Sequence, residues 1–77
     1  MSDQSEIIVD ARGHLCPVPT LMLRRAAERA PDGAILRLIA DDPMARIDAP
    51  HFAAQVGLSL LSVADKGALV IVRVGKP

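Results

Sequence analysis

The alternation of strand-like and helix-like segments constrains the fold more than any other feature of this sequence. Residues 7–9 form a β-branched run that is typical of a buried strand, and a turn with Gly13 follows. Over residues 19–30 the apolar side chains repeat on one helical face, and residues 34–40 (AILRLIA) are then apolar at almost every position, as in a central strand. This strand–helix–strand order predicts a parallel pair of strands with a right-handed crossover.

The second half of the chain predicts a helix and two more strands. Asp48 with Pro50 is typical of a helix start, so we expect a helix at residues 49–56 that Gly57 caps. Residues 58–64 and 68–74 are strand-like, and the hairpin connection between them is expected at residues 65–67. The prediction is an α+β fold of order βαβαββ, in which a mixed sheet carries both helices on one face.

Composition limits the domain count and the classes of partner. With 77 residues the chain supports one domain; we expect residues 1–5 to be disordered and residues 6–77 to form that domain. Lys plus Arg number 9, Asp plus Glu also number 9, and Phe52 is the single aromatic residue, so we expect no direct nucleic-acid binding. No apolar run could span a membrane, and the N-terminal residues do not resemble a signal peptide. We therefore expect a cytoplasmic protein without membrane insertion.

Cys16 is the only cysteine, and it stands directly before Pro17 with Pro19 two residues further on. One cysteine excludes an intramolecular disulfide and a Cys-x-x-Cys pair, and no spacing of His, Cys or carboxylates indicates a metal site, so we predict no metal and no cofactor. Prolines are favoured in the first helical turn because they lack an N–H that would have no partner there. Pro17 and Pro19 thus predict a helix start with Cys16 as its N-cap, where the helix dipole favours a thiolate.

Other polar residues near this position have simpler interpretations. Asp41 and Asp42, followed by Pro43, are interpreted as capping residues rather than acid–base catalysts. His14 is interpreted as a solvated turn residue rather than a base or a metal ligand. The arginines at 24, 25 and 29 share the polar face of the predicted helix, which is either simply solvated or a docking surface for an acidic partner.

These segments together resemble a known family. The run DARGHLCPVP (residues 10–19), the amphipathic helix, LIADDP (residues 38–43) and Asp48-Ala49-Pro50 are similar to the TusA/SirA family of small sulfur carriers, whose hallmark is Cys-Pro-x-Pro at the start of the first helix. The resemblance covers residues 7–75. It implies a two-layer α/β sandwich with strand order 1-2-4-3, in which the last strand is antiparallel to the others.

The resemblance also implies a sulfurtransferase function. In such a carrier Cys16 would hold sulfane sulfur as a persulfide, received from a cysteine desulfurase or a rhodanese-like donor and relayed to an acceptor protein. The end use would be tRNA thiolation, molybdenum-cofactor assembly or sulfur oxidation. Pro17, Pro19 and Gly13 would form the scaffold, and four basic residues are candidates for assisting the reaction or docking a partner: Arg12, His14, Arg24 and Arg25.

Two departures from the family pattern concern partner choice. Many members have a Leu-Arg-like pair before the cysteine and a glutamate between the prolines, where this chain has His14-Leu15 and Val18. Less basic charge therefore stands beside the thiol at neutral pH.

A single thiol fits such a relay, because a second nearby cysteine could attack the persulfide and expel the sulfur. The alternative is a regulatory or protein-interaction module in which Cys16 only packs; a thiol that resists alkylation until the protein unfolds would support it. A haem bound through the Cys16 thiolate is a third hypothesis, which a haem titration would test.

Overall fold

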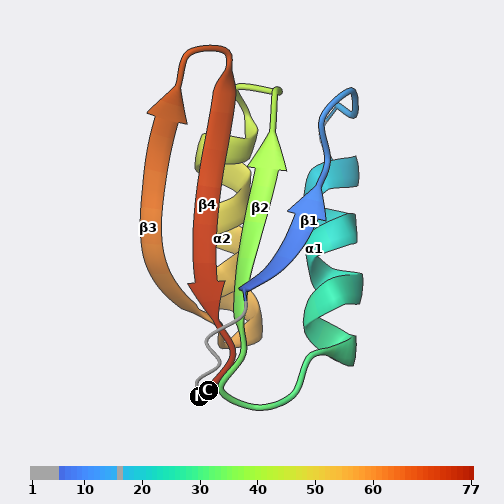
Figure 1. Ribbon diagram of the computed structural model, residues 1–77, viewed down its shortest axis with the longest axis vertical. Coiled ribbons are helices and arrows are strands. Elements are labelled where there is room, and N and C mark those ends of the chain that lie inside the picture. Colours follow the sequence, from blue (N-terminus) through green and yellow to red (C-terminus); the bar gives the residue numbers. More distant parts are fainter. Residues whose placement is uncertain (1–5, 16) are drawn as a thin grey trace.

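A four-stranded sheet forms one layer of the molecule, and two helices on one of its faces form the other (Figure 1). The computed structural model describes residues 6–15 and 17–77, so the predicted disorder of residues 1–5 lies outside the described residues. The elements are β1 (Glu6–Asp10), α1 (Val18–Arg29), β2 (Ile35–Ala40), α2 (Ala45–Val56), β3 (Ser59–Lys66) and β4 (Leu69–Gly75). The expected βαβαββ order and the single helical layer are confirmed.

The sheet order is β1-β2-β4-β3, as the family resemblance implied. β1 and β2 are parallel, while β4 runs antiparallel to both of its neighbours. The β3–β4 connection is one residue shorter than expected and lies further along the chain, because Lys66 still pairs with Leu69 and leaves residues 67–68 as the loop. Gly67 has φ +64°, which suits the first position of a two-residue hairpin turn.

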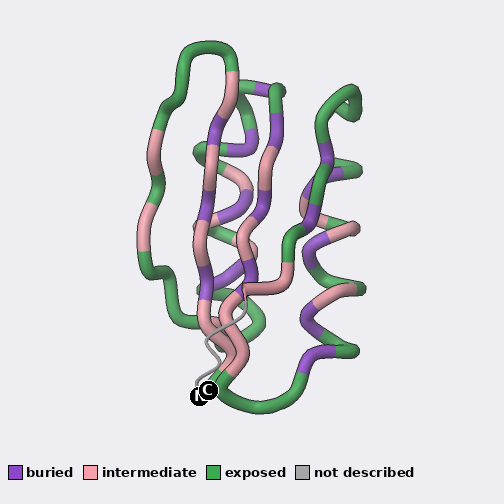
Figure 2. The backbone as a smooth tube through the Cα atoms, in the orientation of Figure 1, coloured by how far each residue is buried: buried purple, intermediate pink, exposed green. Residues whose placement is uncertain are grey.

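The core lies between the sheet and the helices (Figure 2). Every second residue of the two central strands is buried, which is the alternation expected of strands with one covered face. The fully buried strand residues are Leu36, Leu38, Ala40, Val72 and Val74. The helical layer contributes Leu23 and Ala27 of α1, its C-cap Ala30, and Ala49 and Ala53 of α2 to the same core. The amphipathic pattern of the first helix is thereby confirmed.

The second helix begins earlier than predicted. It starts at Ala45, not at residue 49, and includes Pro50 in its interior. Alanines at every fourth position, 45, 49 and 53, are almost fully buried on the sheet, and this packing outweighs the proline, which has no N–H to donate to the carbonyl of Arg46. The end of α2 is as predicted, because Gly57 has φ +82° and the Leu58 N–H donates to the Ala53 carbonyl at 2.9 Å.

Candidate functional site

The loops after the two parallel strands lie at one edge of the sandwich. β1 and β2 are parallel and neighbouring, so they end at the same edge, and α1 and α2 both begin there (Figure 1). Residues 11–17, which we call the motif loop, connect β1 to α1, and residues 41–44 connect β2 to α2. This edge of a parallel strand pair is a common place for functional residues, since loops and helix N-termini converge there.

The first half of the motif loop is held by backbone hydrogen bonds. The N–H of Ala11, a fully buried residue, donates to the Ile39 carbonyl at 2.8 Å, and the His14 N–H donates to the Ala11 carbonyl at 3.2 Å. The Gly13 N–H donates to both carboxylate oxygens of Asp41, at 3.1 and 3.0 Å. Gly13 has φ +85°, a conformation that other residues rarely adopt. The loop after β2 therefore fixes the turn of the loop after β1.

The second half of the motif loop leads into α1 through the two prolines. Pro17 is the N-cap, with φ −97° and ψ 13°, and Pro19 is at the second helical position with its side chain fully buried. The Val18 N–H donates to the Leu15 carbonyl at 2.9 Å. The Pro17 carbonyl accepts from the Leu21 N–H at 3.2 Å and from the Thr20 hydroxyl at 2.8 Å.

These contacts correct the predicted helix start. The N-cap is Pro17 and not Cys16, because the backbone angles of Pro17 lie outside the helical region and the helix begins at Val18. Cys16 itself lies outside the described residues. Its neighbours on both sides are held by hydrogen bonds, and Leu15 is 74% exposed.

Arg12, in the motif loop, binds the carboxylate of Asp10, the last residue of β1. Its Nε and Nη2 donate to the two oxygens of Asp10 at 2.9 and 2.7 Å, and its backbone N–H donates to Oδ1 at 3.2 Å. These hydrogen bonds, with the side-chain ones contributing most, lower the pKa of Asp10 from 3.8 to about 2. The Asp10 carboxylate likewise raises the pKa of Arg12. The charge of Arg12 is thus balanced locally by Asp10.

Of the other basic candidates, only His14 lies in the motif loop. His14 is exposed in the turn. Arg24 lines the groove between the helices, and its Nε lies 3.4 Å from Oε2 of Glu28, one turn further along α1. Arg25 lines a shallow depression with Ile8 of β1. Arg24 and Arg25 also line a depression together with Leu21 and Glu28, so the two arginines are neighbours on the exposed surface of α1.

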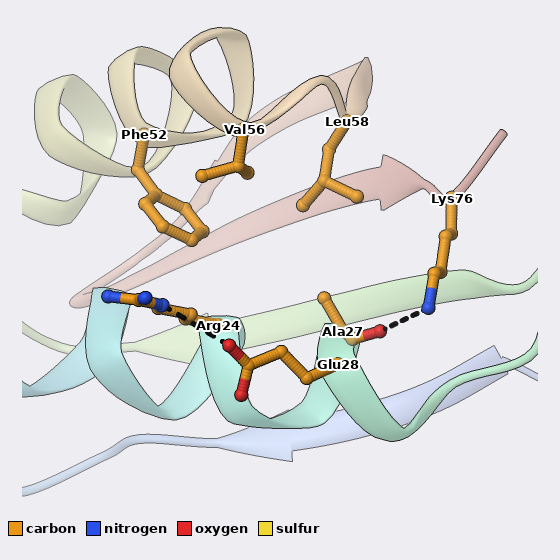
Figure 3. Close-up of a pocket in the computed structure, with 7 residues that line it drawn as sticks. All are labelled: Arg24, Ala27, Glu28, Phe52, Val56, Leu58 and Lys76. Atoms are coloured by element: carbon orange, nitrogen blue, oxygen red, sulfur yellow. Dashed lines mark hydrogen bonds and ion pairs between the residues drawn. The ribbon is translucent and has the colours of Figure 1, made fainter.

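Arg24 borders a groove of about 270 Å³ between the two helices (Figure 3). Phe52, Val56 and Leu58 line its apolar wall. At its far end the Lys76 ammonium donates to the carbonyls of Ala27 and Ala30, at 2.8 and 2.7 Å. A cation there binds carbonyls at the C-terminal end of α1, one of which also accepts the Ala30 N–H, so this groove marks that end of α1 rather than the motif end.

Two features of this edge were missed by the sequence analysis. Asp41 holds Gly13 and does not cap a helix. Asp42, also interpreted as a cap, accepts the Met44 N–H at 3.1 Å in the turn before α2, but the N-cap is Met44 and has no side-chain cap hydrogen bond. The sequence position of Asp41 could have predicted its contact with Gly13. Neighbouring parallel strands end at the same edge, so an acid directly after β2 lies beside the loop that follows β1. The second feature is a group of exposed apolar side chains at the starts of α1 and α2, which we call the apolar rim: Leu15, Val18, Leu21, Met44 and Ile47.

Comparison with known proteins assigns the family. Residues 7–76 match the family model described as sulfurtransferase TusA. The chain belongs to the TusA family. The sulfur carrier protein TusA of Pseudomonas aeruginosa is 36% identical over 61 residues, which cover 79% of this chain and 77% of that protein. The one of Pseudomonas savastanoi pv. phaseolicola is 35% identical over 57 residues, covering 74% and 68%.

A solved structure supports the TusA fold independently. The crystal structure of a SirA-like protein from Desulfitobacterium hafniense superposes with a TM-score of 0.78 and covers 91% of this chain and 99% of that one, at 24% identity. Within residues 6–15 and 17–77, no cluster of three or more His, Cys, Asp or Glu side chains could hold a metal ion. None of the described helices is long and apolar enough to cross a membrane.

Proposed function

We propose that this chain is a sulfur carrier that holds sulfane sulfur as a persulfide on Cys16 and relays it between proteins. The observation that carries the proposal is that the described residues on both sides of Cys16 are held by hydrogen bonds while Leu15 and Pro17 are exposed. Membership of the TusA family supports the same role. We infer a cytoplasmic relay, as expected from the sequence.

Sulfur transfer between persulfides requires an accessible thiolate and few other groups from the protein. The Cys16 thiolate attacks the outer sulfur of a donor persulfide, a new S–S bond forms on Cys16, the donor's S–S bond breaks, and the donor leaves as a thiolate. The same exchange with the roles reversed passes the sulfur to an acceptor thiolate. No net oxidation occurs. The start of α1 favours the thiolate because its first turn contains no acidic residue.

The apolar rim is where a donor or acceptor would dock. Its five side chains come from the starts of both helices, at the edge of the sandwich that carries the motif loop. Exposed apolar side chains grouped beside a reactive residue are typical of a transient protein interface. We infer that a desulfurase or a rhodanese-like protein supplies the sulfur. The acceptor would serve tRNA thiolation, molybdenum-cofactor assembly or sulfur oxidation.

Sulfur loading measured by intact-protein mass spectrometry tests the proposal. Incubation with a cysteine desulfurase and cysteine, or with a rhodanese and thiosulfate, should add the mass of one sulfur atom that dithiothreitol removes. Cys16→Ser is the matched control and should gain none. Failure of the wild-type protein to load from either donor, or equal loading of Cys16→Ser, would refute the carrier role and favour a module in which the cysteine only packs.

A further inference from the structure

The face of the sheet opposite the helices carries aliphatic side chains where polar ones are expected. In a sheet with one covered face, the residues that alternate with the core normally point to water and are polar. On this open face the alternating positions of β1, β2 and β4 include isoleucines, and Leu61 of β3 lies 3.7 Å from the position that a side chain at Gly75 would occupy. The larger aliphatic residues of the open face are Ile8, Ile35, Ile39, Leu61, Leu69 and Ile71. Ile8 is 52% exposed and Leu61 is 48% exposed.

Two arginines lie at the centre of the open face. Arg37 and Arg73 are directly opposite each other on β2 and β4, an arrangement that is unfavourable for like charges. Both contact Glu6: Arg73 Nη2 donates to Oε2 at 2.6 Å, and Arg37 Nε lies 2.9 Å from Oε1. The second contact is close but not aligned as a hydrogen bond, so that Arg37 Nε and Glu6 Oε1 are buried without a hydrogen-bond partner among the described residues.

The open face therefore has surplus positive charge in a chain whose formal net charge is zero. Glu6 is shared between two guanidinium groups, and Asp10, the other carboxylate that the register of β1 places on this face, is bound by Arg12. Lys66 adds a further positive charge at the corner where it pairs with Leu69. The Arg37 side chain is 41% exposed and can bind an additional acceptor.

We propose that the open sheet face is a second docking surface, for a protein partner that presents a carboxylate among aliphatic side chains. The partner's carboxylate would bind Arg37 and complete the charge balance of the arginine pair, and its aliphatic residues would cover the isoleucines. This face lies on the side of the sheet away from both helices (Figure 1), so its partner is separate from the one that docks at the apolar rim.

Other occupants fit the face less well. A second copy of the chain would bring two surfaces with surplus positive charge together. A nucleic acid is bound mainly through many phosphate contacts, whereas this face offers few cations in an aliphatic surrounding. An amphipathic membrane surface uses protruding aromatic and long apolar side chains, and the chain has one aromatic residue, Phe52, which lies on α2.

Site-specific photo-crosslinking in cells of the source organism tests the proposal. A benzophenone amino acid is placed at position 8 or 61 on the open face, and at Gln55, an exposed residue of α2, as the control. The expected result is one protein crosslinked from positions 8 and 61 but not from 55, through a segment with Asp or Glu among aliphatic residues. Arg37→Gln should reduce the yield about fivefold to tenfold, as for the loss of one charge-assisted hydrogen bond. Arg24→Gln, which removes the same charge from the helical layer, should leave it unchanged.

Charge exchange makes the result decisive. Arg37→Glu combined with an acid-to-lysine change in the crosslinked segment should restore the adduct. Circular dichroism and thermal unfolding of Arg37→Gln establish that the variant is folded; Arg73 keeps its hydrogen bond to Glu6 in it. Adducts only within the chain, to a second copy, to nucleic acid or to lipid would overturn the proposal. So would no adduct from the open face, or an adduct that is insensitive to Arg37→Gln. Because Cys16→Ser should not change the yield, failure of this proposal is distinguishable from failure of the carrier role.

Discussion

The two helices begin at the same edge of the sandwich, but their first turns differ in charge. α2 begins next to Asp42, whose carboxylate accepts the Met44 N–H, and Asp48 lies in its first turn. α1 has no acidic residue in its first turn, and neither helix has a side-chain hydrogen bond at its N-cap. The positive pole of α2 is therefore neutralised by the chain's own carboxylates, whereas the first turn of α1 carries no such charge, which suits the proposed thiolate at Cys16. The difference indicates that the start of α2 is stabilised by its own acids and that the start of α1 is suited to the proposed reactive thiol.

The largest effect is expected from removing the carboxylate before α2. Asp42 is 8% exposed, so Asp42→Ala should destabilise the protein by about 1–2 kcal/mol through loss of a buried, charged hydrogen-bond acceptor. Asp42→Asn keeps an acceptor for the Met44 N–H and should cost less. Urea unfolding measures both. Equal stability of Asp42→Ala and wild type would mean that the start of α2 is not stabilised by its acid.

A slightly smaller loss of stability is expected from replacing Gly13 in the motif loop. Gly13 has φ +85° and no atom within 4 Å of an added Cβ, so Gly13→Ala should cost about 1 kcal/mol for conformational reasons alone. Asn tolerates this conformation better, and Gly13→Asn should be closer to wild type. The measurement is again the free energy of unfolding. If alanine and asparagine gave the same loss, the positive φ would not be the cause.

Adding an acid to the first turn of α1 should make it resemble α2. Val18 is exposed, so Val18→Glu should be tolerated, and it should stabilise the helix by about 0.3–1 kcal/mol while lowering the thiolate fraction of Cys16. Iodoacetamide alkylation at neutral pH should then slow down severalfold. Val18→Gln is the uncharged control and should react like the wild type. An unchanged rate in Val18→Glu would contradict the assignment of the α1 pole to the thiolate.

The smallest effect concerns the Asp10–Arg12 pair. Folding lowers the pKa of Asp10 from 3.8 to about 2. The ionised carboxylate therefore stabilises the fold fully at pH values above 3.8, the pKa in the unfolded chain, and this contribution is lost as the pH falls through about 2. Asp10→Asn should therefore show a smaller fall in Tm than the wild type on acidification over that window. Asp32→Asn, in the exposed turn after α1, is the control. A pH dependence of Tm identical to wild type in Asp10→Asn would show that the pair does not persist in solution.

Local patterns predicted most of the fold. The apolar runs and the helical pattern place all four strands and the first helix within a few residues of their observed bounds, because β1, β2, β4 and α1 all contribute apolar residues to the core. The start of α2 was predicted too late in the chain, because a proline such as Pro50 is typical of a first helical turn. The burial of Ala45, Ala49 and Ala53 shows that the helix continues through Pro50. The strand order needed the family resemblance, because residue patterns carry no information about which strands are neighbours.

The candidate site was predictable in its residue types but not in its contacts. Cys16 and its prolines were visible as a motif, yet the one-residue shift of the N-cap to Pro17 depends on backbone angles that no pattern contains. The contact between Asp41 and Gly13 joins residues 28 positions apart and depends on the register of β1 and β2. The surplus charge of the open face likewise follows from Arg37 facing Arg73 across two strands.

The most direct test of the central claim is the alkylation rate of Cys16 in the folded protein, compared with that in guanidinium, across a range of pH. The account predicts that the native thiol reacts with iodoacetamide at least as fast as the unfolded one at neutral pH, with its rate rising at lower pH than in the unfolded chain. A native thiol that reacts far more slowly than the unfolded one at every pH would contradict the account.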